Sequence, residues 1–198
     1  NILRSLENSG RSVSEAKKVY EIVGGTEPSL GILLTYPVTE ITDASKKVSL
    51  LNNVDDKKSS NTKNKNARVS FLGSGNYAAS VLIPAFKATG VSLNNIASNT
   101  GVSGVHIGRK YGFLKTTTDS EYILNDNTTD AVVIATRHIS HAKFVLEALK
   151  AQKHIFVEKP LCLTLNELDQ IQAIYSPSKI LMVGFNRRFA PQVQKIKN

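Results

Sequence analysis

A glycine-rich turn near the middle of the chain has the spacing that cradles a diphosphate. It follows a strand-like run, 68–72, and opens a helical pattern, 76–89. In this context a G-x-G-x-x-G/A pattern indicates a dinucleotide site. The first glycine permits a tight turn, the second lets the backbone approach the diphosphate, and the small last residue lets helix and strand pack closely. A turn that binds another ligand, or none, is the alternative. The residues concerned are Gly73, Ser74, Gly75, Asn76, Tyr77 and Ala78.

The end of the second predicted strand, 95–99, carries polar residues and no carboxylate. In an NAD site, an acidic residue about 20 residues beyond the first glycine binds the ribose hydroxyls. Ser98, Asn99 and Thr100 stand near that place instead, and they can hydrogen-bond a 2′-phosphate that a carboxylate would repel. The predicted cofactor is therefore NADP or NAD, with a slight preference for NADP.

Strands and helices alternate regularly from Ala67 onward, which indicates βαβ units and a parallel sheet. Pro84 falls inside the first predicted helix, where it should kink the helix or start a new turn. Thr164 and Glu167 have the spacing of a capping box, which opens another helix. The fold class predicted is α/β, a Rossmann-type doubly wound parallel sheet of about six strands with an N-terminal helix-strand extension. The strands are expected at 68–72, 95–99, 115–118, 131–135, 154–157 and 179–184.

The chain divides into three predicted parts: residues 1–43, a polar linker over 44–66, and the main domain over 67–198. The extension has capping-box spacing at Ser12 and Glu15, helical periodicity to Val23, and a strand-like run, 30–36. One helix and one strand bury too little apolar surface to fold alone, so this part must pack on another part or another copy.

Charge and composition limit the partners. The formal net charge is +9, and much of the excess lies in the linker, whose Asn, Ser and Lys residues favour a flexible tether. No aromatic residue is interleaved with those lysines for base stacking, so we do not expect a nucleic-acid partner. Apolar runs are far shorter than the roughly 20 residues that cross a bilayer, so no membrane partner is expected. Cys162 is the only cysteine, which favours a cytoplasmic location and provides no metal site.

Four segments together resemble the glucose-fructose oxidoreductase, inositol dehydrogenase and MocA (Gfo/Idh/MocA) family. They are the glycine turn, residues 134–141, the Glu158-Lys159-Pro160 triplet and residues 184–191. Residues 1–37 resemble the tail of a medium-chain, zinc alcohol dehydrogenase-like domain. This order of parts resembles bi-domain oxidoreductases, and the resemblance covers nearly all the chain except the linker.

The resemblance implies hydride transfer between a nicotinamide cofactor and the hydroxyl carbon of a sugar, polyol or related small molecule. It makes Lys159 the catalytic residue, beside the nicotinamide. Pro160 also favours an extended Lys159 at a strand end, although a solvated surface lysine has the same local sequence. Arg137 and His138 stand where the family more often has Pro-Asn, and His141 reads equally well as a packing group. The further cofactor-binding residues expected are Thr136, Arg137, His141, Glu158, Lys159, Pro160 and Arg187.

Family members continue into a second domain that binds substrate and often forms the oligomer interface. None of that domain is present in this sequence, so we expect a cofactor-binding piece that does not turn over substrate by itself. The parent protein is expected to be a homo-oligomer. A non-catalytic Rossmann-type nucleotide-binding or sensing module remains the alternative.

Overall fold

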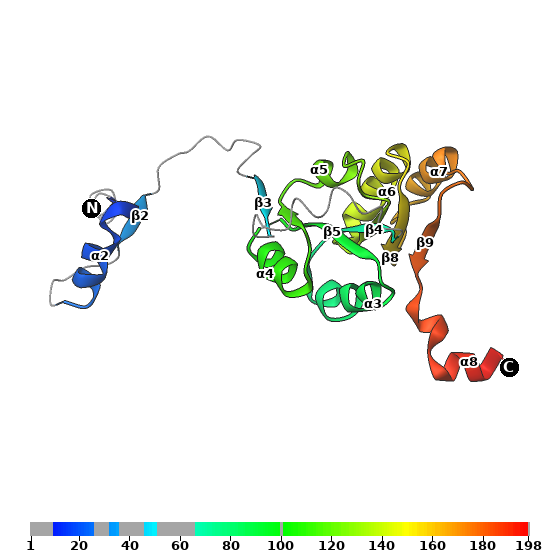
Figure 1. Ribbon diagram of the computed structural model, residues 1–198, viewed down its shortest axis with the longest axis horizontal. Helices are drawn as coiled ribbons and strands as arrows, with labels where there is room; N and C mark the ends of the chain where they lie inside the picture. The colour runs from blue at the N-terminus through cyan, green and yellow to red at the C-terminus, as the bar shows by residue number, and fades with distance from the viewer. Residues whose placement is uncertain (1–9, 26–31, 36–45, 51–65, 100, 198) are drawn as a thin grey trace. The chain divides into compact units, whose positions relative to one another are not determined.

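The computed structural model describes residues 10–25, 32–35, 46–50, 66–99 and 101–197 (Figure 1). The chain separates into two compact units, Asn1–Thr42 and Asp43–Asn198. None of the described helices is long and apolar enough to span a bilayer.

In the described part of the first unit, one helix is flanked by two short strands. Strand β1 (Gly10–Ser12) leads through a 3-10 turn, η1 (Val13–Glu15), into α2 (Ala16–Val23), and β1 pairs in parallel with β2 (Leu33–Thr35). The helix and the second strand agree with the expected extension. Strand β1 was not expected, because its Gly-Arg-Ser sequence has no apolar alternation.

The second unit is built on a seven-stranded sheet in the order β3-β6-β5-β4-β7-β8-β9. Every neighbouring pair is parallel except β3 with β6. The predicted Rossmann-type fold is confirmed, with one strand more than the six expected. The strands are β3 (Lys47–Ser49), β4 (Arg68–Leu72), β5 (Ser92–Ala97), β6 (Lys115–Thr117), β7 (Ala131–Ile134), β8 (His154–Glu158) and β9 (Leu181–Gly184).

Helices cover both faces of this sheet (Figure 1). One face carries α3 (Ile83–Ala88) and α4 (Val102–Tyr111), and the other carries α5 (Ser120–Leu124), α6 (His141–Lys150) and α7 (Leu165–Ile174). Strand side chains alternate between the two cores: in β7, Val132 and Ile134 face the α6 side and Val133 the α3 side. Strand β7 is therefore apolar throughout, as in sheets buried on both faces. Two 3-10 turns, η4 (His138–Ser140) and η5 (Asn186–Phe189), and α8 (Pro191–Lys197) complete the unit.

The helix after the glycine turn changes its geometry just before Pro84. Residues 78–82 form a π-helix, η3 (Ala78–Leu82), and Pro84 lies in the first turn of α3. Proline has no N–H to donate, and the first turn of an α-helix needs none there. The predicted new turn at Pro84 is thus present, in the form of a π-helix followed by an α-helix.

Strand β3 corrects the predicted linker. Its residues lie inside 44–66, yet they form an antiparallel edge strand in which Val48 pairs with Thr116. The expected flexible tether is therefore wrong for residues 47–49, and residues 51–65 lie outside the described part of the chain. The physical reason is alternation: Val48 and Leu50 share one side of the strand, and Leu50 packs on the α4 side of the core.

A polar cluster ties together the edge of the sheet where β7 and β8 begin. The carboxylate of Asp126 accepts hydrogen bonds from Asn95 (2.6 Å), Asn94 (3.1 Å) and Thr128 (2.7 Å). The buried Nζ of Lys153 donates to the carbonyls of Asp126 and Thr129, each at 2.9 Å. Burial raises the pKa of Asp126, but the hydrogen bonds from Thr128, Asn95 and Asn94 outweigh that effect and hold its pKa below the usual value.

This cluster predicts a pH-dependent contribution to stability. The pKa of Asp126 is lower in the folded than in the unfolded chain, so its contribution is present at neutral pH and is lost as the pH falls below about 4 and through the folded pKa. We expect Asp126→Asn to lower the free energy of unfolding by about 1–2 kcal/mol at pH 7 and by less at pH 3. Urea unfolding measures both, with Asp169→Asn, on the exposed side of α7, as the control. An equal loss at both pH values would contradict this prediction.

Candidate functional site

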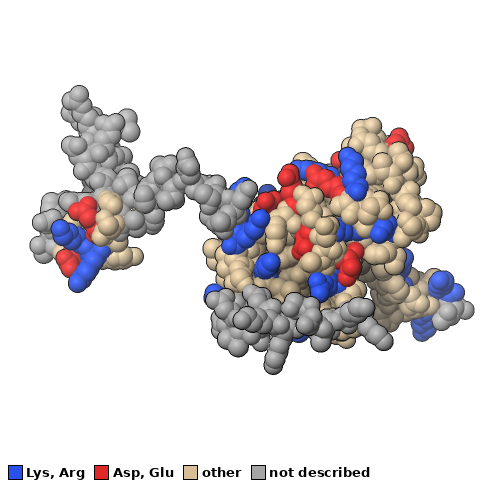
Figure 2. All heavy atoms as spheres, turned by 45° about the horizontal axis from the view of Figure 1, so that its top comes forward, with Lys and Arg blue, Asp and Glu red and all other residues tan. Residues whose placement is uncertain are grey.

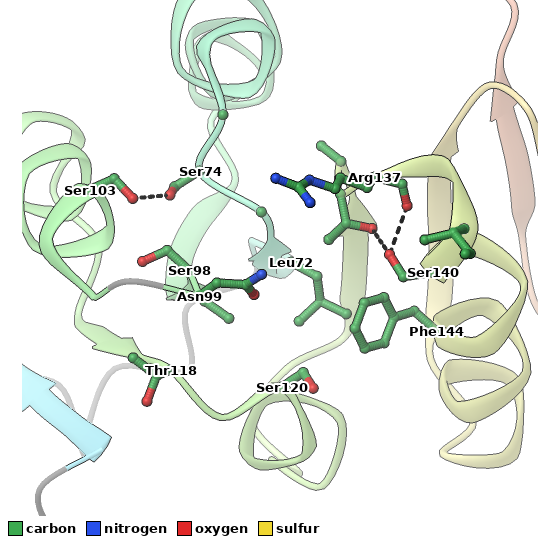
Figure 3. A pocket seen from close by; sticks show the side chains of 16 residues that line it. Leu72, Ser74, Ser98, Asn99, Ser103, Thr118, Ser120, Arg137, Ser140 and Phe144 are labelled. Carbon is green, nitrogen blue, oxygen red and sulfur yellow. Dashed lines mark hydrogen bonds between the residues drawn. The ribbon is translucent and has the colours of Figure 1, made fainter.

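A cleft of about 730 Å³ opens at the carboxyl ends of β4, β5 and β7 (Figure 3). Strands β5 and β7 flank β4. From β4 the chain continues to β5 on one side of it, and it later crosses to β7 on the other side. Such a switch point is where open α/β sheets bind ligands. The cleft is lined by Leu72, Gly73, Ser74, Gly75, Ala97, Ser98, Asn99, Ser103, Thr118, Ser120, Ala135, Thr136, Arg137, Ile139, Ser140 and Phe144.

The glycine turn has the geometry that its sequence predicts. Gly73 has φ +106°, and a Cβ there would lie 2.4 Å from the carbonyl oxygen of Ala135. At Gly75, by contrast, a Cβ would have no neighbour within 4 Å, so space is open above the backbone. Ala78 is buried against the sheet. The turn leads into a continuous helical run, residues 76–88, whose first N–H groups favour negative charge.

Polar side chains join the glycine turn to the start of α4. The hydroxyls of Ser74 and Ser103 share a hydrogen bond at 2.8 Å (Figure 3). The Ser98 hydroxyl is buried and accepts a hydrogen bond from the N–H of Gly104 at 3.1 Å. Ser98 therefore supports α4 as well as lining the cleft, and Asn99 beside it is exposed. Thr100 lies outside the described residues.

The end of β7 supplies the opposite wall. Thr136 and Ser140 share a hydrogen bond at 2.7 Å, and the Ser140 hydroxyl donates to the carbonyl of Arg137 at 2.7 Å. The Arg137 side chain extends into the cleft from this wall (Figure 3). Among the described residues that line the cleft, Arg137 alone carries a charge.

The structure corrects the role expected of His141. Its ring is fully buried and does not line the cleft. Nδ1 lies 2.6 Å from the carbonyl oxygen of Pro160, and Nε2 lies 3.1 Å from that of Thr136. Both ring nitrogens thus face backbone oxygens, so the ring is not free to contact a cofactor. Instead, it joins the cleft wall at Thr136 to the turn that follows Lys159.

Glu158, Lys159 and Pro160 lie beside the cleft without lining it. Ile134 pairs with Val157, which places Lys159 level with Thr136 at the same edge of the sheet. The Lys159 side chain is exposed, whereas the Oε1 atom of Glu158 is buried and makes no hydrogen bond within the described chain. Burial raises the pKa of Glu158. Gly184, paired with Glu158, leaves room for this carboxyl group, because a Cβ there would lie 2.6 Å from Oε1.

Four other expected residues also lie outside the cleft lining, and the buried Ala78 is one of them. Asn76 and Tyr77 begin the helical run, and Arg187 is exposed in η5. The Tyr77 hydroxyl accepts a hydrogen bond from the side-chain N–H of Asn186 at 3.0 Å, which links the glycine turn to the segment after β9.

Several cleft residues were not expected from the sequence. These residues share only their position, because each stands just after a strand end or in the first turn of the helix that follows. Polar side chains are common at such positions for local reasons, so the position alone does not predict a site. These residues are Ser103, Thr118, Ser120, Ile139, Ser140 and Phe144. Within the described residues, no group of three His, Cys, Asp or Glu side chains could hold a metal ion.

Basic and acidic side chains are interspersed on the face of the second unit that Figure 2 shows. The described residues of that face therefore do not form the continuous basic band typical of a nucleic-acid surface.

Comparisons with known proteins give concordant results. The chain is 42% identical over 82 residues to the uncharacterized oxidoreductase YrbE of Bacillus subtilis, covering 41% of this chain and 24% of that protein. It is 37% identical over 89 residues to the myo-inositol 2-dehydrogenase of Thermotoga maritima, covering 44% of this chain and 27% of that protein. The chain thus matches about a quarter of the length of these curated relatives.

Among solved structures, the second unit has the fold of KijD10, a 3-ketoreductase from Actinomadura kijaniata solved with TDP-benzene and NADP. The TM-score is 0.61 at 24% identity, over 66% of this chain and 42% of that one. The model of the Gfo/Idh/MocA family, described as an oxidoreductase family with an NAD-binding Rossmann fold, matches residues 67–185, more than half of the chain. The chain therefore belongs to the Gfo/Idh/MocA family of oxidoreductases, and these residues are its NAD(P)-binding domain.

Proposed function

We propose that the parent of this chain transfers hydride between NAD(P) and the hydroxyl carbon of a sugar, polyol or related small molecule. The observation that carries the proposal is the cleft at the switch point, where the glycine turn faces the end of β7 and Lys159 stands level with Thr136. One relative is named as a dehydrogenase of myo-inositol, which is a polyol, and this name supports the proposed substrate class. The bound cofactor would accept or supply the hydride.

The residues present fit a dinucleotide. The space above the backbone of Gly75 is empty, so a diphosphate can approach the first N–H groups of the helical run. Arg137 extends into the same cleft and can pair with a phosphate oxygen. The apolar side chains of Ile139 and Phe144 line the same cleft and offer surface to a ring.

We propose NADP as the preferred cofactor. The lining at the end of β5 contains Asn99 with hydroxyl groups from Ser103 and Thr118, and no carboxylate stands among the described lining residues to repel a 2′-phosphate. Ser98 lines the cleft too, and although its hydroxyl accepts the Gly104 N–H, its own O–H can still donate to a phosphate oxygen.

Lys159 is the proposed catalytic residue. In the reducing direction its ammonium group would donate a proton to the carbonyl oxygen of the substrate, and in the oxidising direction its neutral amine would take the proton of the reacting hydroxyl. His141 holds the carbonyl of the next residue against the cleft wall, so Lys159 keeps a defined place relative to the cofactor. We assign His141 a positioning role in place of the cofactor contact expected from the sequence.

The remaining parts of the chain belong to the same proposal. We propose that the parent has a substrate domain and forms a homo-oligomer, as expected from the resemblance. We also propose that residues 1–43 are the tail of a zinc alcohol dehydrogenase-like domain. The parallel β1–β2 pair around α2 in a separate unit supports that origin.

A substitution at Gly75 tests cofactor binding without a large effect on folding. We expect Gly75→Val to leave the free energy of unfolding within about 1 kcal/mol of wild type, because a Cβ meets nothing there. The same change should weaken NADPH binding at least about tenfold, because the side chain occupies the approach of the diphosphate. Nicotinamide fluorescence titration and urea unfolding measure the two effects. Gly73→Ala is the matched contrast and should destabilise the fold, since its Cβ meets the Ala135 carbonyl. Unchanged NADPH affinity in Gly75→Val would overturn the proposed site.

Lys159 is tested in a parent protein that carries the substrate domain. We expect Lys159→Met to lower kcat at least about 100-fold, because proton transfer loses its partner. The dissociation constant for NADPH should stay within about threefold of wild type, since the side chain does not line the cleft. Lys150→Met, at an exposed position on α6, is the matched control. Turnover retained in Lys159→Met would contradict the catalytic role of Lys159, whereas a wild-type parent that binds NADPH without any turnover would favour a nucleotide-sensing module.

A further inference from the structure

Strand β3 lies beside the cleft and outside the family-matched region. The family match begins at residue 67, whereas β3 spans Lys47–Ser49 and pairs antiparallel with β6. Figure 3 shows this strand, in cyan, beside Thr118 at the edge of the cleft. The strand is therefore a feature of this chain that the family model does not include.

Two backbone hydrogen bonds outside the paired residues extend this contact. The N–H of Leu50 donates to the carbonyl of Leu114 at 2.9 Å, and the N–H of Thr118 donates to the carbonyl of Lys46 at 3.1 Å. Thr118 also lines the cleft. The second bond thus connects β3 directly to a residue of the proposed cofactor site.

The side chain of Leu50 connects β3 to a second wall of the cleft. It packs on the core beneath α4, where a Cβ at Gly108 would lie 2.3 Å from the Leu50 Cδ1 atom. The first turn of α4 carries Ser103, which is bonded to Ser74 of the glycine turn. Leu50 therefore packs against the helix whose start closes one side of the cleft.

We infer that β3 is an accessory part of the cofactor site, such that docking of β3 on β6 and binding of the dinucleotide stabilise each other. The inference rests on the proposed function, because it requires a dinucleotide in the cleft.

The physical basis is the difference in stability between the edge and the centre of the sheet. A three-residue edge strand with exposed side chains opens at a lower free energy than the buried strands β4 and β7. A cofactor that contacts Thr118 and Ser103 while β3 is docked on β6 binds the docked state more tightly than the open state. It therefore raises the population of the docked state. The coupling is reciprocal, so loss of β3 docking must weaken cofactor binding by the same factor.

The Leu50 amide reports on docking without touching the cleft. We expect saturating NADPH to slow its hydrogen exchange at least about fivefold, the lower end of typical coupling between sites. Stabilisation of the whole domain does not produce this change, because the amide exchanges through local opening of β3. The Thr118 amide should be slowed as well.

One substitution beside β3, with a matched control elsewhere, tests the reciprocal effect. Leu50→Ala removes the packing against α4 and should raise the dissociation constant for NADPH roughly fivefold. Leu165→Ala is the matched control, because Leu165 is 78% exposed on α7 and lies outside β3 and the cleft lining, and it should leave the dissociation constant unchanged. Thermal unfolding of each variant shows that the central sheet still folds.

The outcomes separate this inference from the proposed function. Slowed Leu50 exchange, with weaker binding in Leu50→Ala alone, supports the coupling. NADPH that binds and leaves the Leu50 amide unchanged overturns the coupling and leaves the cofactor site intact, with β3 only covering the sheet edge. If the folded wild-type chain binds neither NADPH nor NADH, the proposed function fails and the coupling fails with it.

Discussion

The cleft depends on the close approach of Gly73 to the backbone at the end of β7. A side chain at residue 73 would meet the carbonyl oxygen of Ala135, and the N–H of Gly73 donates to the carbonyl of Ala97 at 3.0 Å. One residue without a side chain therefore holds the ends of β5 and β7 against the end of β4. The space between these strand ends is the cleft, so the sheet order and the glycine turn produce the site together.

Much of the site is positioned by hydrogen bonds among its own backbone and side chains. Ser98 supports α4, Ser140 holds the turn at Arg137, and His141 joins Thr136 to Pro160. These groups keep the walls in place and leave Gly75 and Arg137 open to a ligand. A site built in this way needs little rearrangement when it binds, which lowers the cost of ordering side chains. The buried His141 also contacts the backbone of the turn that follows the exposed lysine after β8.

The parts that were predictable from the sequence are those with a local signal. The glycine turn, the buried strands and the capping box at Thr164 each have a spacing that one element alone explains, and the structure contains all three. Strand β3 was missed because Val48 and the adjoining Leu50 lie in a stretch that also carries Lys46 and Lys47. The ring contacts of His141 were also missed, because they join residues that are close only in the folded sheet.

The central claim, that the cleft binds a nicotinamide dinucleotide, is tested most directly by following backbone amide resonances while NADPH is added to this chain. The account predicts saturable one-to-one binding, with the largest shifts at Gly73, Ser74 and Gly75 and at the ends of β5 and β7. Saturable binding with shifts confined to other parts of the sheet, or no binding by the folded chain, would contradict it.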